Sequence, residues 1–198
     1  ITSTAHYVPE KILTNSDLEK LVDTSDEWIK SRVGINQRHV VSDGEASSDM
    51  STKVAHSLLE KRGISAANID VIIIGTVTTD HPTPSTAAIV QNNINAENAW
   101  AFDLSAACSG FLYALETGAK FIESGQYKTI MVIGVDTMTS ILDFEDRETC
   151  IIFGDGAGGV ILEASKSNTG ILGSVLKTDG SGADSLNVLA GGSKYPAS

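Results

Sequence analysis

The run Val71–Ile74, within DVIIIGTV at 70–77, constrains the fold most, because it is apolar on both faces of the strand it would form. A strand of this kind is typical of the middle of a sheet that helices cover on both sides. Further apolar runs rich in β-branched residues occur at 99–105 and 129–136, and helical patterns alternate with them. The sequence therefore predicts a layered α/β fold.

The remaining elements follow from periodicity and from end signals. Strands are expected at 1–8, 70–77, 99–105, 129–136, 149–153, 159–164 and 170–178, and helices at 15–22, 25–32, 47–62, 85–94 and 109–124. Thr14 or Asn15 is expected to cap the first short helix, and Ser25 the second. The helix at 109–124 has almost no polar face and is predicted to be buried all round. From 166 onward the chain is expected to form mainly loops.

Composition excludes several classes of function. Acidic residues outnumber basic ones by 25 to 14, which gives a net charge of −11, so nucleic acid is not expected as a partner. The two cysteines form no CxxC, and the four histidines show no metal spacing. No run is long enough to span a membrane, and the start lacks the pattern of a signal peptide. A cytoplasmic enzyme fits these properties.

Cys108 lies in FDLSAACSGF at 102–111, between an expected strand and the start of the apolar helix. The unpaired N–H groups at a helix N-terminus favour the nucleophilic thiolate. Small neighbouring residues leave room for a substrate. The residues alone also allow Cys108 to be a small core residue, as most free cysteines are. Cys150, inside the strand expected at 149–153, is predicted to belong to the core.

Two weaker sequence signals also resemble those of binding sites. Gly154, Gly156 and Gly159 match the GxGxxG string of dinucleotide-binding folds, but an expected strand follows them where such a site needs a helix. This segment is instead predicted to be a turn between two strands. Trp28 and Arg147 lie in polar surroundings, and side chains of these two types can sandwich a purine ring. The positions of these two residues in the sequence are, by themselves, weak evidence for a purine site.

Several long motifs together resemble one family, the β-ketoacyl-acyl carrier protein synthase III enzymes that start fatty-acid synthesis. They occur in the family's order and cover nearly the whole chain: TNSDLEKLVDTSDEWIKSRVGI at 14–35, HPTPSTAA at 81–88, AFDLSAACSGFLYAL at 101–115, DRETCIIFGDGAGGVIL at 146–162 and DGSGADSL at 179–186. The resemblance implies a thiolase fold built from two similar βαβαβαββ halves. Residues 1–165 would form the amino-terminal half, and 166–198 would begin the connection to a second half that the sequence does not contain.

The resemblance also implies an activity and a site. Cys108 would take an acyl group, expected to be acetyl, from acyl-CoA and condense it with malonyl-acyl carrier protein, releasing CO₂ without a cofactor. Trp28 and Arg147 would lie on either side of the CoA adenine, and Thr24 and Arg32 would line the CoA channel. The family further implies a homodimer that pairs through the strand near 99–105.

Two departures from the family leave questions open. Thr83 stands where the family commonly has a Phe or Leu that reaches the partner's acyl pocket, so the starter chain length is not fixed. The family's catalytic His and Asn belong to the second half, and none of the four histidines of this chain lies in that motif. The alternatives are a relative that transfers acyl groups to another acceptor, or a non-catalytic half-domain or partner subunit. A pure scaffold would not need Cys108, Trp28 and Arg147.

Overall fold

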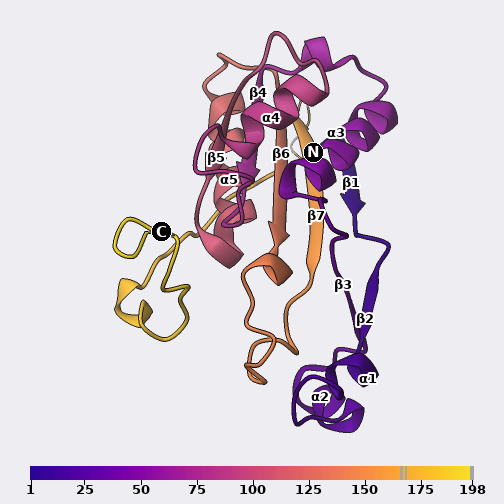
Figure 1. Cartoon of the computed structure of the whole chain (residues 1–198). Coiled ribbons are helices and arrows are strands. Elements are labelled where there is room, and N and C mark those ends of the chain that lie inside the picture. The colour runs from indigo at the N-terminus through magenta and orange to yellow at the C-terminus, as the bar shows by residue number, and fades with distance from the viewer. Residues whose placement is uncertain (166, 168, 197–198) are drawn as a thin grey trace.

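A mixed sheet forms the centre of the molecule, which the computed structural model describes over residues 1–165, 167 and 169–196 (Figure 1). The strand order is β1-β7-β6-β4-β5. β4 pairs in parallel with β5 and β6, whereas β7 pairs antiparallel with β6 and β1. The strands are β1 (Ser3–Tyr7), β4 (Val71–Gly75), β5 (Trp100–Leu104), β6 (Thr129–Thr137) and β7 (Asp155–Glu163).

Helices cover both faces of this sheet, as the sequence predicts. α3 (Ser47–Arg62) and α4 (Thr86–Asn93) lie on one face, and α5 (Gly110–Glu123) lies on the other. The predicted bounds of these three helices differ from the observed ones by no more than one residue at each end. The sheet therefore separates two hydrophobic clusters.

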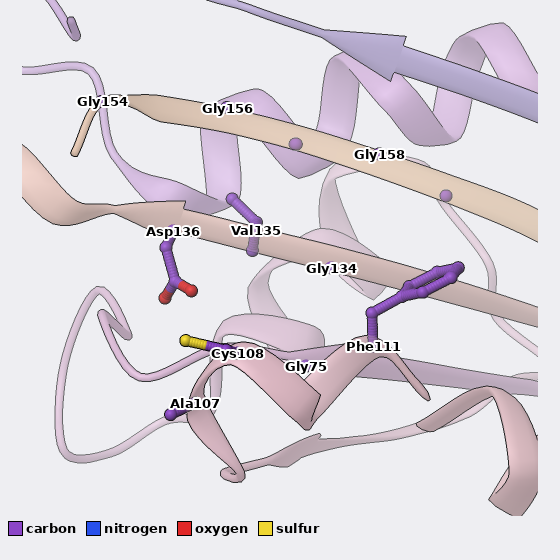
Figure 2. Close-up of a pocket in the computed structure, with 12 residues that line it drawn as sticks. Gly75, Ala107, Cys108, Phe111, Gly134, Val135, Asp136, Gly154, Gly156 and Gly158 are labelled. Carbon is purple, nitrogen blue, oxygen red and sulfur yellow. The ribbon is translucent and has the colours of Figure 1, made fainter. Parts of the chain in front are cut away.

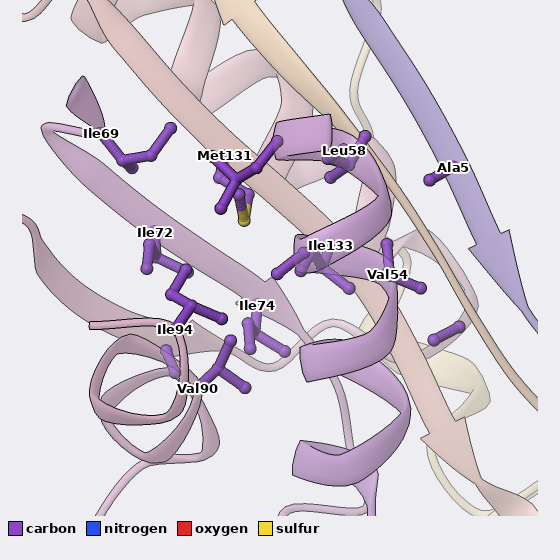
Figure 3. Close-up of a cluster of buried hydrophobic side chains, with 14 of the residues drawn as sticks. Ala5, Val54, Leu58, Ile69, Ile72, Ile74, Val90, Ile94, Met131 and Ile133 are labelled. Carbon is purple, nitrogen blue, oxygen red and sulfur yellow. The ribbon is translucent and has the colours of Figure 1, made fainter. Parts of the chain in front are cut away.

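The fully buried strand β4 shows how the sequence builds both clusters. Ile72 and Ile74 pack with residues of α3 and α4 (Figure 3), whereas Val71 and Ile73 pack with α5. All four side chains are completely shielded from solvent. Because successive side chains of a strand point to opposite faces, an uninterrupted apolar run serves both layers at once.

A small module precedes α3. It contains a two-stranded antiparallel sheet, formed by β2 (Ile12–Thr14) and β3 (Gln37–His39). Two short helices, α1 (Asn15–Leu18) and α2 (Asp26–Val33), lie between these strands in the sequence. The Thr14 hydroxyl accepts a hydrogen bond from Asp17 N, and the Ser25 hydroxyl accepts one from Trp28 N, so two of the predicted caps are confirmed. In Figure 1 the module lies beyond one end of the sheet, close to the β6–β7 connection.

The module and the β6–β7 connection share a hydrophobic cluster of their own. Its buried members are Leu18, Ile29, Cys150 and Ile151. Cys150 is a core residue, as expected, but the strand predicted at 149–153 is wrong because residues 149–152 form turns. Cys150 and Ile151 are buried with residues of α1 and α2 rather than by the sheet, whereas Ile152 is 42% exposed.

Other local predictions are also wrong. The glycines at 156, 158 and 159 lie within β7 and not in a turn between two strands. The helix predicted at 15–22 ends at Leu18. The small sheet of β2 and β3 was not predicted, and residues 170–178 do not form the strand that was expected there. α5 is not buried all round, since Leu112 is 55% exposed and only small residues of the helix, which lie against the sheet, are buried.

The boundary expected between 165 and 166 stays a prediction, because residue 166 lies outside the described residues. No helix in the described part of the chain combines the length and the apolar character that crossing a membrane requires.

The adjacent glycines Gly158 and Gly159 of β7 give a test of the packing. A Cβ on Gly159 would lie 2.9 Å from both the Ile133 side chain and the Val132 carbonyl oxygen, whereas a Cβ on Gly158 would meet only Ala5 O at 3.8 Å. We expect Gly159→Ala to lower the free energy of unfolding by about 2 kcal/mol, as overpacking of a dense core does. The matched control Gly158→Ala should change it by less than about 0.5 kcal/mol. Urea denaturation measures both, and equal losses would contradict the packing described.

Candidate functional site

Cys108 lies at the tip of a sharp turn between β5 and α5. Ala107, which precedes it, has a φ of +45°, in the left-handed region that costs a non-glycine residue about 1 kcal/mol. A single 3₁₀ turn, Ala107–Ser109, then leads directly into α5. The turn leaves Cys108 exposed at the helix N-terminus. Strained turns of this kind are frequent at functional sites, where they fix the direction of a side chain.

A close backbone contact sets the position of this turn. A Cβ on Gly75, the last residue of β4, would lie 2.8 Å from the carbonyl carbon of Gly110, the first residue of α5. Thr76 N also donates a 3.2 Å hydrogen bond to Leu104 O. The first turn of α5 therefore rests directly on the end of β4, and only glycine at 75 permits this approach.

Cys108 faces a hollow of about 550 Å³ (Figure 2). Half of the residues that line it are glycines, so its wall is largely main chain and leaves space for a ligand. A cavity of this volume is within the range of small-molecule sites. The lining residues are Gly75, Ala107, Cys108, Phe111, Gly134, Val135, Asp136, Gly154, Gly156, Ala157, Gly158 and Gly159.

Asp136 is a lining residue that sequence reasoning missed. Its Oδ1 accepts hydrogen bonds from Thr76 Oγ1 at 3.1 Å, Val77 N at 2.9 Å, and Thr78 N and Oγ1 at 3.2 and 2.9 Å. In Figure 2 its carboxylate and the Cys108 sulfur point into the same space. The available signal was an acidic residue near the end of the otherwise apolar strand at 129–136. Asp136 fixes the turn that follows Gly75.

Asp103 in β5 anchors the N-terminus of α4. Its carboxylate accepts hydrogen bonds from Thr86 N at 2.7 Å and Ala87 N at 2.8 Å. Burial raises the pKa of Asp103, and these two N–H donors oppose the rise. Thr83, in the loop before α4, is exposed and does not line the Cys108 hollow.

A second group of predicted residues meets on the small module. The Arg147 guanidinium carbon lies 4.6 Å from the centre of the Trp28 ring, and that of Arg32 lies 5.7 Å from it. Both distances are in the range of cation–π contacts. Arg147 Nη1 also donates a 2.9 Å hydrogen bond to Asp23 O. Thr24, next in sequence, has a buried hydroxyl with no hydrogen-bond partner among the described residues. We call Trp28 and Arg147 the clamp.

The comparisons agree with this architecture. The profile of a family described as 3-oxoacyl-[acyl-carrier-protein (ACP)] synthase III matches residues 102–180. The β-ketoacyl-[acyl-carrier-protein] synthase III of Chlorobaculum tepidum is 58% identical over 201 residues, covering 100% of this chain and 61% of that protein. The crystal structure of 3-oxoacyl-[acyl-carrier-protein] synthase III from Aquifex aeolicus has 46% identity and a TM-score of 0.82, covering 84% of this chain and 54% of that one. That of the Thermus thermophilus β-ketoacyl-[acyl carrier protein] synthase III has 38% identity and a TM-score of 0.88, covering 93% and 57%.

Over its whole length the chain is similar to β-ketoacyl-[acyl-carrier-protein] synthase III proteins. It spans 61% of the length of the Chlorobaculum tepidum relative. The predicted fold, one half of a thiolase fold with helices on both sides of a mixed sheet, is confirmed by the Aquifex and Thermus structures of this family.

The two cysteines of the chain should differ in reactivity. Burial, with a smaller contribution from Asp146, raises the pKa of the Cys150 thiol, so less thiolate is present at a given pH. Cys108 is exposed. We expect N-ethylmaleimide at pH 7 to add once to the native protein, at Cys108, and a second time only after unfolding. Intact mass and peptide mapping measure this, and rapid native labelling of Cys150 would contradict it.

The contact between Gly75 and Gly110 gives a further test. We expect Gly75→Ala to push the first turn of α5 away from β4 and so slow the alkylation of Cys108 by iodoacetamide several-fold, since small displacements of a reactive group have large rate effects. Gly110→Ala is the matched control, because its Cβ would lie 3.6 Å from Gly75 Cα, an ordinary contact. Equal alkylation rates in the two variants would show that this contact does not position the thiol.

Proposed function

We propose that the protein is a β-ketoacyl-[acyl-carrier-protein] synthase III that takes an acyl group from acyl-CoA onto Cys108 and condenses it with malonyl-acyl carrier protein. One observation carries this proposal: an exposed cysteine, held by a strained turn at a helix N-terminus, faces a glycine-lined hollow of about 550 Å³. The family of the chain gives this geometry its chemical interpretation.

In the first step the Cys108 thiolate attacks the carbonyl carbon of the acyl thioester. The bond from that carbon to the CoA sulfur breaks, and CoA leaves as a thiolate that takes up a proton. The N-terminus of α5 favours the attacking anion, and main-chain N–H groups at the turn are suited to stabilise the negative oxygen that forms. The predominance of main chain in the wall keeps side chains from obstructing the attack.

In the second step the malonyl group loses CO₂, and the enolate that results attacks the Cys108 thioester. The new carbon–carbon bond gives the β-ketoacyl product, and the bond to Cys108 sulfur breaks to restore the thiol. Neither step needs a redox cofactor or a metal. Among the described residues, no histidine lines the hollow. This chain therefore accounts for the loading step in more detail than for condensation.

The clamp is suited to the adenine end of CoA. Its 4.6 Å separation is a stacking distance, so a purine enters between Trp28 and Arg147 only after the Arg147 side chain swings outward. Arg147 is exposed, so that movement disturbs no buried side chain, but it breaks the hydrogen bond to Asp23 O. Arg32 and the buried Thr24 hydroxyl lie in the same region and are suited to line the channel.

A homodimer is the proposed assembly, with β5 as the contact. β5 is an edge strand of the sheet, and unpaired edges favour pairing with another chain. Trp100 in this strand is 42% exposed and contacts the rings of Phe102, Phe121 and Tyr127. Because Thr83 is smaller than the Phe or Leu common in the family, a partner's Thr83 would obstruct the acyl pocket less. Acetyl remains the proposed starter group. The proposed location of the protein is the cytoplasm.

The loading step can be tested by intact mass after mixing the full-length protein with acetyl-CoA. We expect one acetyl group to be added, located on the peptide that contains Cys108. Cys108→Ala should abolish the adduct, since it removes the nucleophile. Cys150→Ala, which alters the buried cysteine, should retain it. An adduct that persists in Cys108→Ala, or none with the unaltered protein, would overturn the proposed function.

A further inference from the structure

Arg38 in β3 is buried in an unusual way. Its side chain is only 4% exposed, yet no ion pair with a carboxylate is formed by it within the described part of the chain. Instead the guanidinium donates to neutral oxygens: Nε to Ile151 O at 3.0 Å, Nη2 to the same oxygen, and Nη1 to Asn15 Oδ1 at 2.7 Å. Burial lowers the pKa of Arg38.

One arm of this network leads to the helix that carries Trp28. Asn15 is 1% exposed, and its Nδ2 donates to Asp26 Oδ1 at 2.8 Å and to Ile35 O at 2.9 Å. Asp26 is the first residue of α2, and Ile35 follows its last turn. A single amide therefore joins the two ends of α2, and Arg38 holds that amide.

The other arm leads to the turn that carries Arg147. Ile151, whose carbonyl receives two of the Arg38 donors, lies four residues after Arg147. The intervening chain is tightly turned, with Cys150 N donating to Asp146 O at 3.0 Å and Thr149 Oγ1 donating to the Asp146 carboxylate. The position of this carbonyl thus constrains the position of Arg147.

Arg38 also lies close to Gly154, the residue that precedes β7. A Cβ added to Gly154 would lie 3.0 Å from Arg38 Cβ, and Gly154 lines the Cys108 hollow. Burying a charge without a counter-ion is costly, and apolar residues often replace buried ionic groups without loss of stability. A contribution to stability alone therefore does not explain why a planar, forked donor occupies this place.

We propose that Arg38 is a positioning residue: it sets the separation of Trp28 and Arg147, and so the affinity for the adenosine part of a CoA substrate, without touching that substrate. This inference rests on the proposed function. It assigns the spacing of two stacked side chains to one buried guanidinium, which bonds directly to Ile151 O and, through Asn15, to both ends of α2.

The test compares Arg38→Lys and Asn15→Ala in the full-length protein. Lysine keeps the charge but not the fork, and Asn15→Ala removes one of the two acceptors while sparing Arg38. The probes are adenosine 3′,5′-bisphosphate, measured by calorimetry, and acetylation of Cys108 by acetyl-CoA or by acetyl-pantetheine, which lacks adenosine. We expect a loss of affinity for the bisphosphate and a rise in KM for acetyl-CoA of about tenfold. Loading from acetyl-pantetheine should change less than twofold.

The matched control is Lys20→Gln, which alters an exposed cation of the same module that is paired with Asp17. It should leave all three readouts unchanged. If an Arg38 or Asn15 variant that retains its circular dichroism spectrum impairs both thioesters equally, the role of the network is structural and the inference is overturned. Unchanged affinity in both variants overturns it as well, and if Arg38→Lys fails to fold, Asn15→Ala decides.

Trp28→Ala separates this inference from the proposed function. If it does not weaken binding of the bisphosphate, the adenine site proposed here is wrong, whatever the Arg38 variants do. If it weakens binding and the folded Arg38 and Asn15 variants do not, the adenine site stands and the positioning role of Arg38 is wrong. Weakening in all three variants, with acetyl-pantetheine loading preserved, supports both.

Discussion

The direct contact of main chain between the end of β4 and the first turn of α5 determines the rest of the site. Gly75 lacks the Cβ that would collide with the Gly110 carbonyl group, so strand and helix approach without a side chain between them. That approach forces the connection from β5 into a short turn with Ala107 in the left-handed region. Cys108 is exposed because the turn leaves it no place in the core. The fully buried strand β4 provides the rigid support.

The parts of the fold that depend on local pattern could be predicted from the sequence. The apolar run at 71–74 indicated a buried strand, and the helix at 47–62 ended at Gly63, which has a φ of +71°. The segment 149–153 was assigned wrongly because burial by α1 and α2 gives the same apolar composition as burial in a sheet. The small sheet of β2 and β3 was missed because a strand of three residues is too short to show the alternation of apolar and polar residues that identifies a strand.

The residues of the site likewise divide into those that local sequence could predict and those that it could not. Cys108 could be singled out from its place between a strand and an apolar helix, which is local information. Trp28 and Arg147 are 119 residues apart in sequence, and only the family resemblance paired them before the structure showed their contact. Arg38 gave no signal and Asn15 was considered only as a helix cap, since polar residues are usually exposed and only the tertiary structure shows that these two are buried.

The electrostatics of the chain give the clamp its physical importance. A net charge of −11 would oppose the approach of the CoA substrate proposed above, which is anionic, but distant charges are screened beyond about 8 Å at physiological ionic strength. Near Arg147 the acids are partly engaged: hydrogen bonds from Thr149 and Glu148 N lower the pKa of Asp146 and fix its orientation. The cations of Arg147 and Arg32 are held at the Trp28 ring. Under the proposed function, binding at the adenine end would therefore depend on these short-range contacts, and the proposed spacing by the buried network would matter more than the overall field.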